Sequence, residues 1–579
     1  MSKKPTRSKN QPQPKRGREI FGLFALAFAL RMLGISWGIP TARHIYSYHP
    51  DEIHVLSPAL LYMLRGDWNP HFFNYGTLYL YLVGFVSKLF ALIGLSPGNM
   101  VFAQIGNSPT YLPDLSFLHL IGRTITALLG AGSIVLIYLI GKKLGGRGLG
   151  IGAALLLTFA PLHLVNSHFA TVDVPATFFL LLAALFCLNI ISEGRLRWYV
   201  LAGAAIGLAA ATKYTLAAGI VLIIGAHLLR GRFALREHLP LAAGLLVFPL
   251  FFLIGCPYAL TLEGGLAIRP EFLQGFRFEA QHMREVRTAA FVDTGSGWLY
   301  HAVRGLPAAL GIPLYLLSLA GMALAILYKP PAGSKASGRD SVVSGRDSIA
   351  RKGFLLFACW CIFFFVMIGF ASERFIRYLV PLVPFLCLFA AWLLGRLFSS
   401  NMKFRKPVLA GLGVMLALTL LYSLSQLLLF IYPDARDRAL LKAFSGSHTV
   451  RIGVTETPWF QIPPVSPYNG GALSHVAFEK WQRDAPFYKV IVTGWNVAAL
   501  EKAKPESFVI SDMQYADPLR LENAQAKSFM EALDLHYTNK ETYGGHNLME
   551  WLGGGRENAP PDWLYLNPAE KIYSGWKND

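Results

Sequence analysis

Runs of about 20 apolar residues recur along this chain, and they limit its possible folds more than any other feature. Residues 20–39 and 354–370 are two examples. A helix needs about 20 residues to cross roughly 30 Å of hydrocarbon, so each run is a candidate membrane-spanning helix. At 54% hydrophobic and 15% charged residues, the chain is too apolar for a soluble protein of this size. The sequence therefore predicts an all-α polytopic membrane protein.

About eleven apolar segments can be distinguished between residues 20 and 431. They lie near 20–39, 77–95, 117–140, 149–165, 174–191, 198–229, 239–257, 299–328, 354–371, 376–397 and 407–431. We interpret 20–431 as one multi-spanning domain in the lipid bilayer, with outer loops at 40–76 and 258–298.

The positions of the basic residues explain the formal net charge of +19. No basic stripe with interleaved aromatic residues is present, so we expect no nucleic-acid partner. Lysine and arginine are instead enriched in the cytoplasmic loops of membrane proteins. The basic clusters are 3–18, Lys142/Lys143/Arg147, Arg195/Arg197, Arg230/Arg232/Arg236, 329–352 and Arg396/Lys403/Arg405/Lys406. They predict a cytoplasmic tail over 1–19 and place the remaining loops on the outer side.

Two apolar runs do not fit a simple count of crossings. A full crossing by 77–95 would place Lys142 and Lys143 outside, so we expect this segment to be juxtamembrane or re-entrant. Residues 198–229 begin and end at cytoplasmic clusters, and Lys213 interrupts them. Two short helices that meet at Lys213 would satisfy both facts.

Two polar regions complete the organisation of the chain. Residues 330–352 contain Ser-Gly-Arg-Asp-Ser twice in a Gly/Ser-rich setting, which predicts a disordered cytoplasmic loop. From 432 to 579 the composition becomes mixed, with strand-like 450–454, 490–493 and 507–510 and helix-like 498–504. We predict a small α/β domain there, on the extracytoplasmic side of the membrane. It contains no cysteine.

The first polar motif follows the first apolar run directly. It reads Tyr-His-Pro-Asp-Glu-Ile-His over 48–54, with Asp51 and Glu52 between His49 and His54. A carboxylate there can accept the proton of an attacking hydroxyl group. With an imidazole, it could also hold a divalent cation beside a phosphate. The alternative is an ordinary solvated loop.

A second motif, Asn-Ser-His-Phe-Ala-Thr-Val-Asp-Val-Pro, spans 166–175 in an outward loop before an apolar helix. It places Asp173, and with it His168, at the same membrane face as Asp51. Because acidic residues cap helix N-termini and Pro175 follows, Asp173 could be a simple cap. If a cation is bound, Asp51 and Asp173 are its candidate ligands.

A third motif, Ser-Glu-Arg-Phe-Ile-Arg-Tyr-Leu-Val-Pro, spans 372–381 at another outward turn. Arg374 and Arg377 lie three residues apart, and the forked donors of arginine suit a phosphate. A single arginine at headgroup depth often only snorkels to the interface. Arg123 and Lys213 are further cations near the membrane that could reach the same group or form structural ion pairs.

In this order the three motifs resemble the C-type glycosyltransferases that use lipid-phosphate sugars, such as protein O-mannosyltransferases and the aminoarabinose transferases of lipid A. The resemblance covers most of 20–400. It includes the Asp51-Glu52 pair, Gly-Asp-Trp at 66–68, Arg123 in the apolar run 117–140, Asp173-Val174-Pro175, and Arg377-Tyr378 with Pro381 and Pro384.

The resemblance implies an inverting transfer of a sugar from a polyprenyl-phosphate carrier to an acceptor hydroxyl at the outer membrane face. It implies that Asp51 is the catalytic carboxylate. One segment departs from the family: residues 74–78 read Asn-Tyr-Gly-Thr-Leu where aminoarabinose transferases have Lys-Pro-Pro and mannosyltransferases His-Pro-Pro. This departure leaves the sugar and the acceptor open.

A secondary transporter or lipid flippase is the alternative, since it would also combine many helices with a few intramembrane charges. Such proteins usually contain paired halves with interrupted helices near the midplane. Here the polar motifs gather at one face, and the two halves look unlike each other. These features favour a transferase.

Overall fold

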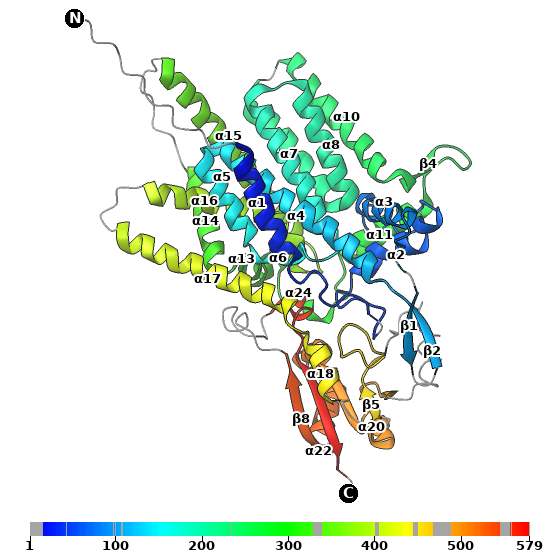
Figure 1. The fold of residues 1–579 in the computed structure, drawn as a ribbon. Coiled ribbons are helices and arrows are strands. Elements are labelled where there is room, and N and C mark those ends of the chain that lie inside the picture. Colours follow the sequence, from blue (N-terminus) through cyan, green and yellow to red (C-terminus); the bar gives the residue numbers. More distant parts are fainter. Residues whose placement is uncertain are drawn as a thin grey trace, which may run out of the picture.

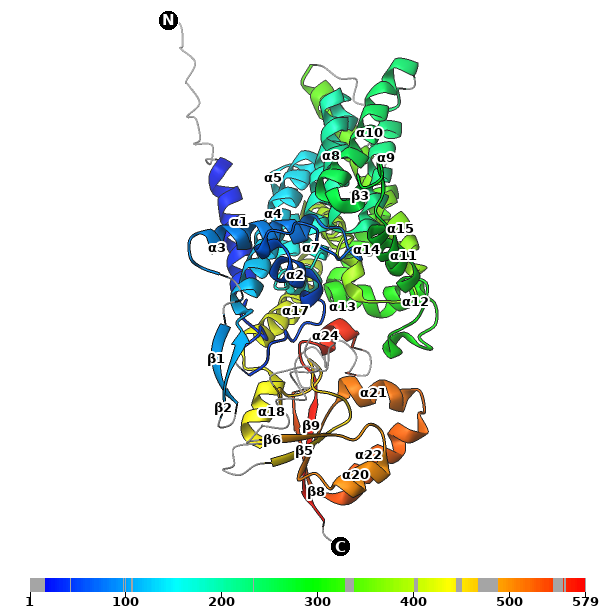
Figure 2. The ribbon, with the colours of Figure 1, turned by 90° about the vertical axis from the view of Figure 1, so that its right-hand side faces the viewer.

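The computed structural model contains a helical bundle with a smaller α/β unit at one end (Figures 1 and 2). The structure describes residues 16–41, 43–96, 98, 100–105, 108–232, 234–327, 338–399, 405–443, 450–466, 488–544, 556 and 559–577. The N-terminal helix lies in the bundle, whereas the described C-terminal end lies at the tip of the α/β unit. The basic tail over 1–15 lies outside the described residues.

The bundle is built from helices of very different lengths. The α-helices are α1 (Arg16–Met32), α2 (Glu52–Leu61), α3 (Leu78–Leu92), α4 (Ser116–Gly145), α5 (Arg147–Thr158), α6 (Pro161–Asn166), α7 (Asp173–Glu193), α8 (Leu196–Thr212), α9 (Ile220–Arg230), α10 (Leu239–Gly255), α11 (Pro270–His282), α12 (Gly297–Tyr300), α13 (Leu306–Leu310), α14 (Ile312–Leu327), α15 (Gly338–Gly369), α16 (Val383–Ser399) and α17 (Arg405–Ile431). Short 3₁₀ or π segments are η1 (Met63–Arg65), η2 (Tyr214–Gly219), η3 (Leu235–Glu237), η4 (Pro257–Ala259), η5 (Ala289–Phe291), η6 (His301–Gly305) and η7 (Ile376–Leu379), and two hairpins pair β1 (Met100–Ile105) with β2 (Ser108–Pro113) and β3 (Leu260–Thr261) with β4 (Ala267–Ile268).

Fewer helices reach full spanning length than the count of apolar runs predicts. Among the described residues, five helices are long and apolar enough to cross a membrane, or six if the bent pair 297–310 and 312–327 forms one span. Other apolar runs form helices of 10–17 residues because breaks divide them. At one such break Gly146, with φ 86°, separates α4 from α5. The chain is nevertheless an integral, multi-pass membrane protein.

The two irregular runs, 77–95 and 198–229, differ from simple spanning helices. Helix α3 is seen almost end-on in Figure 1 and lengthwise in Figure 2, so it runs across the direction of the bundle helices. Helix α8 ends at Lys213, whose backbone is extended at φ −145° and ψ 115°, and η2 and α9 follow. The predicted break at Lys213 is confirmed.

Helix α15 overlaps the second part of 330–352, for which a disordered loop is predicted. Helix α15 begins at Gly338 and continues without interruption to Gly369. Once the apolar half of a helix has formed, each added residue gains a hydrogen bond without a new nucleation step. The polar segment can therefore extend this helix despite its disorder-like composition. Residues 330–337 lie outside the described part.

The C-terminal unit is a mixed five-stranded sheet with helices on both faces. Its elements are α18 (Ala435–Ala443), β5 (Val450–Val454), β6 (Tyr488–Val492), α20 (Val497–Ala503), β7 (Ser507–Ser511), α21 (Asp512–Arg520), α22 (Ala524–His536), β8 (Tyr537–Tyr543), α24 (Pro561–Leu564) and β9 (Glu570–Trp576). The strand order is β6-β5-β7-β9-β8, with β5 parallel to β6 and β7.

Alternating side chains of the strands explain why both faces of this sheet are covered. In β7, Val509 packs in one cluster with Leu440 of α18, while Phe508 and Ile510 pack in another with Phe529 of α22. The predicted fold class, an all-α membrane domain followed by a small α/β unit, is confirmed.

Candidate active site

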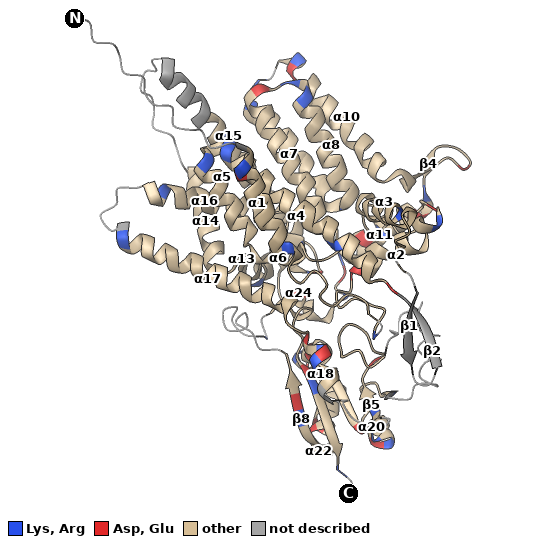
Figure 3. Cartoon of the chain, viewed as in Figure 1, with Lys and Arg blue, Asp and Glu red and all other residues tan. Residues whose placement is uncertain are grey.

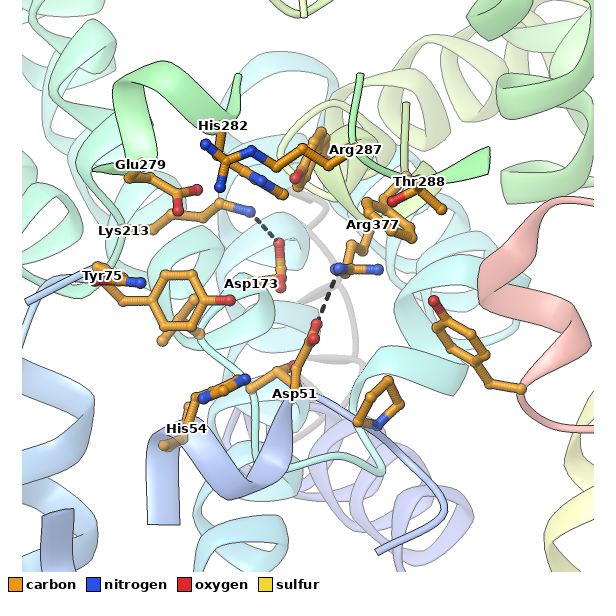
Figure 4. Close-up of a pocket in the computed structure, with 18 of the residues that line it drawn as sticks. Asp51, His54, Tyr75, Asp173, Lys213, Glu279, His282, Arg287, Thr288 and Arg377 are labelled. Atoms are coloured by element: carbon orange, nitrogen blue, oxygen red, sulfur yellow. Dashed lines mark hydrogen bonds and ion pairs between the residues drawn. The ribbon is translucent and has the colours of Figure 1, made fainter. Parts of the chain in front are cut away.

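A cavity of about 460 Å³ lies where the bundle meets the C-terminal unit (Figure 4). This volume is typical of small-molecule sites, which occupy about 300–1,000 Å³. The polar or charged side chains in its wall belong to Asp51, His54, Asn74, Tyr75, Thr171, Asp173, Lys213, Glu279, His282, Arg287, Thr288, Arg377, Tyr378, Gln461 and Tyr565. The three polar motifs therefore meet in one cavity.

Asp51 and Arg377 form one ion pair across the cavity. An Arg377 Nη2 lies 2.9 Å from Asp51 Oδ2, as the dashed line in Figure 4 shows. Asp51 directly precedes helix α2, and Arg377 lies in η7, so two outward turns bring the pair together. Burial opposes ionisation of Asp51, but Arg377 and the neighbouring histidines hold its pKa below the ordinary value. Asp51 is therefore a carboxylate at neutral pH.

Asp173 and Lys213 form a second ion pair, with 2.5 Å between Lys213 Nζ and Asp173 Oδ1. Asp173 is the first residue of α7, and no side-chain cap bond is made at this helix end. The interpretation of Asp173 as a simple cap is therefore not supported. The ammonium of Lys213 also lies 4.7 Å from the ring centre of Tyr378.

The break after α8 and a glycine bring the cavity walls close together. The extended backbone at Lys213 ends the helix at the depth of the cavity. On the other side of the cavity, the segment with Tyr75 packs against the end of α8. This close approach is possible because Gly76 has no side chain. A Cβ on Gly76 would lie 2.1 Å from the Ala211 carbonyl oxygen. The segment that departs from the family pattern thus lines the site.

Helix α11 of the outer loop supplies two further titratable groups, Glu279 and His282. They are three residues apart and so share one helix face, which points into the cavity in Figure 4. Burial raises the pKa of Glu279, more than Lys213 and Arg377 lower it. Arg287 follows in the same loop, and its ion-pair partner is the largely exposed Glu285 at 3.3 Å.

No curated protein matches the chain in sequence. Among solved structures, ArnT from Cupriavidus metallidurans bound to undecaprenyl phosphate is similar with a TM-score of 0.49 and 18% identity, over 74% of this chain and 73% of ArnT. The archaeal oligosaccharyltransferase AglB from Archaeoglobus fulgidus, in complex with an inhibitory peptide and a dolichol-phosphate, has a TM-score of 0.44 and 11% identity, over 90% of this chain and 73% of AglB.

A family model matches one part of the chain. Residues 117–254 match the family described as dolichyl-phosphate-mannose-protein mannosyltransferase. This range includes the arginine-bearing helix, the second acidic motif and Lys213, which are parts of the motif series identified in the sequence. The similarity to this mannosyltransferase family thus covers less than half of the chain, and it includes two of the charged residues that line the cavity, Asp173 and Lys213.

Not every predicted site residue reaches the cavity. Glu52 and Arg123 form a fully buried pair, with Arg123 Nε and Nη2 donating to Glu52 at 2.8 and 2.7 Å. Arg123 also donates to the carbonyls of Ile35 and Trp37, and Glu52 accepts the Ala170 N–H. Neither side chain lines the cavity, and both hold loops together instead, so a catalytic Glu52 and a phosphate-binding Arg123 stay predictions that these contacts do not favour.

Three other predicted site residues, His49, His168 and Arg374, lie outside the cavity wall. His49 is buried against Phe169, and its Nδ1 accepts the Asp51 N–H at 3.3 Å, so it supports Asp51 from behind. Burial lowers the pKa of His49, and the neutral ring suits this acceptor role. His168 bonds to backbone carbonyls and stacks on Phe430, and Arg374 donates to Thr294 in a neighbouring pocket.

The sequence motifs missed part of the wall. Tyr75, Glu279, His282, Arg287 and Thr288 come from outer loops, and Trp459, Phe460, Gln461 and Tyr565 come from the C-terminal unit. The spacing of Glu279 and His282 on one face of an outer-loop helix was a usable signal. No local signal marks the C-terminal residues, because only the docking of that unit brings them to the cavity.

Proposed function

We propose that this glycosyltransferase moves a sugar from a polyprenyl-phosphate carrier to an acceptor hydroxyl in the cavity between bundle and C-terminal unit. The observation that carries the proposal is the pair of carboxylates, Asp51 and Asp173, each held by a cation in one cavity. Such an arrangement offers cations to a phosphate and a carboxylate to a hydroxyl group. ArnT and AglB, whose structures contain undecaprenyl phosphate and dolichol-phosphate, suggest the same class of carrier.

Three cations are available for the phosphodiester of the donor. Arg377 and Lys213 are paired with carboxylates inside the cavity, whereas Arg287 pairs only with the largely exposed Glu285. An arriving phosphate adds negative charge and therefore competes with Asp51 for Arg377. Donor binding would thus loosen the Asp51–Arg377 pair and leave Asp51 free to meet the acceptor.

Asp51 acts as the base in this proposal. The acceptor hydroxyl attacks the anomeric carbon on the face opposite the phosphate, so the configuration at that carbon inverts. The bond from carbon to the acceptor oxygen forms, the bond to the phosphate oxygen breaks, and the hydroxyl proton passes to the Asp51 carboxylate. Since Arg377 lowers the pKa of Asp51, loss of that contact to the phosphate strengthens the base at the moment of transfer.

A divalent cation between Asp51 and Asp173 stays a prediction. Within the described ranges, no three His, Cys, Asp or Glu side chains are arranged to hold a metal ion. An ion bound by the two aspartates would have to replace Arg377 and Lys213 as their partners.

We further propose that the cavity faces outward. Figure 3 shows lysines and arginines at the bundle end away from the C-terminal unit, and such residues prefer the cytoplasmic side. We expect Lys142, Arg232 and Ser341 to face the cytoplasm and Asp51, Asp173, Glu279 and 432–579 to face outward. In a chain freed of its native cysteines, an impermeant thiol reagent on intact cells should label Lys502→Cys but not Arg232→Cys. The reverse pattern would place the site on the wrong face for this proposal.

Arg377 provides a test of the donor contact. We expect Arg377→Ala to raise the KM for the lipid-linked donor by about a hundredfold and Arg377→Lys by about tenfold, because lysine keeps the charge but loses the fork. Steady-state kinetics at fixed acceptor concentration measures both. Arg277→Ala is the matched control, since Arg277 is exposed on α11 outside the cavity wall. Unchanged donor kinetics in both Arg377 variants would move the phosphate to Lys213 or Arg374.

The proposal is tested in cells by mass spectrometry of glycolipids, glycoproteins and glycans with and without this chain. We expect a glycan modification that disappears on deletion, returns with the wild-type chain and does not return with Asp51→Asn. A glycan profile that is identical in all strains would contradict the transferase proposal. It would favour the transporter alternative, which predicts redistribution of a lipid without a new glycosidic bond.

A further inference from the structure

The C-terminal unit inserts one short helix into the wall of the active site. Helix α24 carries Asp562, Trp563 and, just after its end, Tyr565. Trp563 is buried and its Nε1 donates to the Tyr422 hydroxyl of α17 at 3.2 Å. The Tyr565 carbonyl accepts a bond from Arg436 Nη2 at 2.9 Å. The first contact fixes α24 at the membrane domain, and the second ties the residue after it to α18 of the same C-terminal unit.

Asp562 contacts the turn that carries the phosphate-binding arginine. Its Oδ2 accepts the Ile376 N–H at 3.0 Å, and its Oδ1 accepts Arg377 Nη1 at 3.1 Å. The Asp562 side chain is 8% exposed, so water weakens this pair little. One carboxylate thereby holds both the backbone and the side chain of the same turn.

Arg377 is consequently held from two sides. Its Nη1 meets Asp562 and its Nη2 meets Asp51, while the guanidinium lies 3.8 Å from the ring centre of Phe375. Of the two carboxylates, Asp51 lines the cavity, whereas Asp562 is not among its lining residues. A phosphate that enters the cavity can replace Asp51 at Nη2 and leave the Asp562 contact in place.

We propose that Asp562 is a positioning residue. From the C-terminal unit it holds Nη1 of Arg377, so that Nη2 of the same arginine can exchange Asp51 for the donor phosphate. The C-terminal unit then takes part in binding the donor. Without Asp562, Asp51 is the one carboxylate among the described residues that still pairs with Arg377. Replacement of Asp51 by the donor phosphate then becomes less favourable. This inference rests on the proposed function, because Arg377 acts there as a ligand of the phosphate.

The test is a double-mutant cycle in purified full-length protein with a polyprenyl-phosphate sugar as the donor. We expect Asp562→Asn to raise the donor KM about tenfold, with kcat changed by less than about threefold and an unchanged acceptor KM. Asp562→Glu, which keeps the charge one methylene further out, should give an intermediate donor KM. In an Arg377→Ala background, Asp562→Asn should change the donor KM no further, since it acts through Arg377.

A purely structural role predicts different results. Asp534→Asn, the same substitution at an exposed position of the C-terminal unit outside the cavity wall, is the matched control and should leave the donor KM unchanged. An unchanged donor KM in Asp562→Asn, or a tenfold rise that persists in the Arg377→Ala background, overturns the role of Asp562. If Asp562→Asn does not fold, an unchanged donor KM in Asp562→Glu does the same. A wild-type protein that consumes no donor would instead refute the proposed function itself.

Discussion

Asp51→Asn is expected to abolish sugar transfer while the protein still inserts and folds. A positioned base contributes roughly a hundredfold to ten-thousandfold to such a step, and asparagine cannot accept the proton. Asparagine keeps the size of aspartate and can still accept a hydrogen bond from Arg377, so the cavity should remain intact. Turnover of a lipid-linked sugar by the purified variant, beside its thermal unfolding profile, measures both parts.

Two variants separate this role from a general effect of charge. Asp67→Asn is the matched control, and this variant should keep the wild-type activity. Asp67 lies in the same outer loop, is half exposed and pairs with His71. Asp173→Asn should give an intermediate loss, since it leaves Lys213 without its carboxylate but keeps the base. Near-normal turnover in Asp51→Asn would end the assignment of Asp51.

Glu52→Gln should behave in the opposite way to Asp51→Asn: the variant should lose stability, with no specific loss of catalysis. Both Glu52 and Arg123 are fully buried, and removal of one charge leaves the other uncompensated. Breaking such a pair costs about 3–5 kcal/mol, which is a large part of the stability of a typical domain. We expect low yield and a markedly lower Tm in detergent.

The pair offers its own control. Replacing both members by apolar residues, as in Glu52→Leu with Arg123→Met, removes both buried charges and should recover part of the lost Tm. Glu263→Gln, at an exposed position of another outer loop, should leave the Tm unchanged. A Glu52→Gln protein that is as stable as wild type but inactive would return Glu52 to the catalytic candidates.

Asp51 and Glu52 show where sequence analysis reaches its limit. Both carboxylates stand in one motif, and the sequence gives no reason to divide their roles. The division depends on Arg123, which lies 71 residues from Glu52 in the chain and meets it only in the folded bundle. Neighbouring side chains at the start of α2 then point to different surroundings, one to the cavity and one to the core.

Features that depend on local sequence were predictable. The apolar runs predict the membrane helices, Lys213 predicts the break after α8, and the hydrophobic stretch 450–454 corresponds to strand β5. Residues of the cavity that come from distant segments, such as Trp459 and Tyr565, were not. Their position depends on how the C-terminal unit docks, which involves contacts between regions more than 100 residues apart.

If sugar is transferred from a lipid phosphate in this cavity, the purified protein should release polyprenyl phosphate from the donor. Purified protein in lipid nanodiscs, with no ion or substrate gradient, is mixed with a polyprenyl-phosphate sugar and a hydroxyl-bearing acceptor mixture, and release of polyprenyl phosphate is followed. We predict release by the wild-type protein and none by Asp51→Asn. Equal release by both proteins, or an intact donor with wild-type protein across polyprenyl-phosphate pentoses and hexoses, would contradict the account.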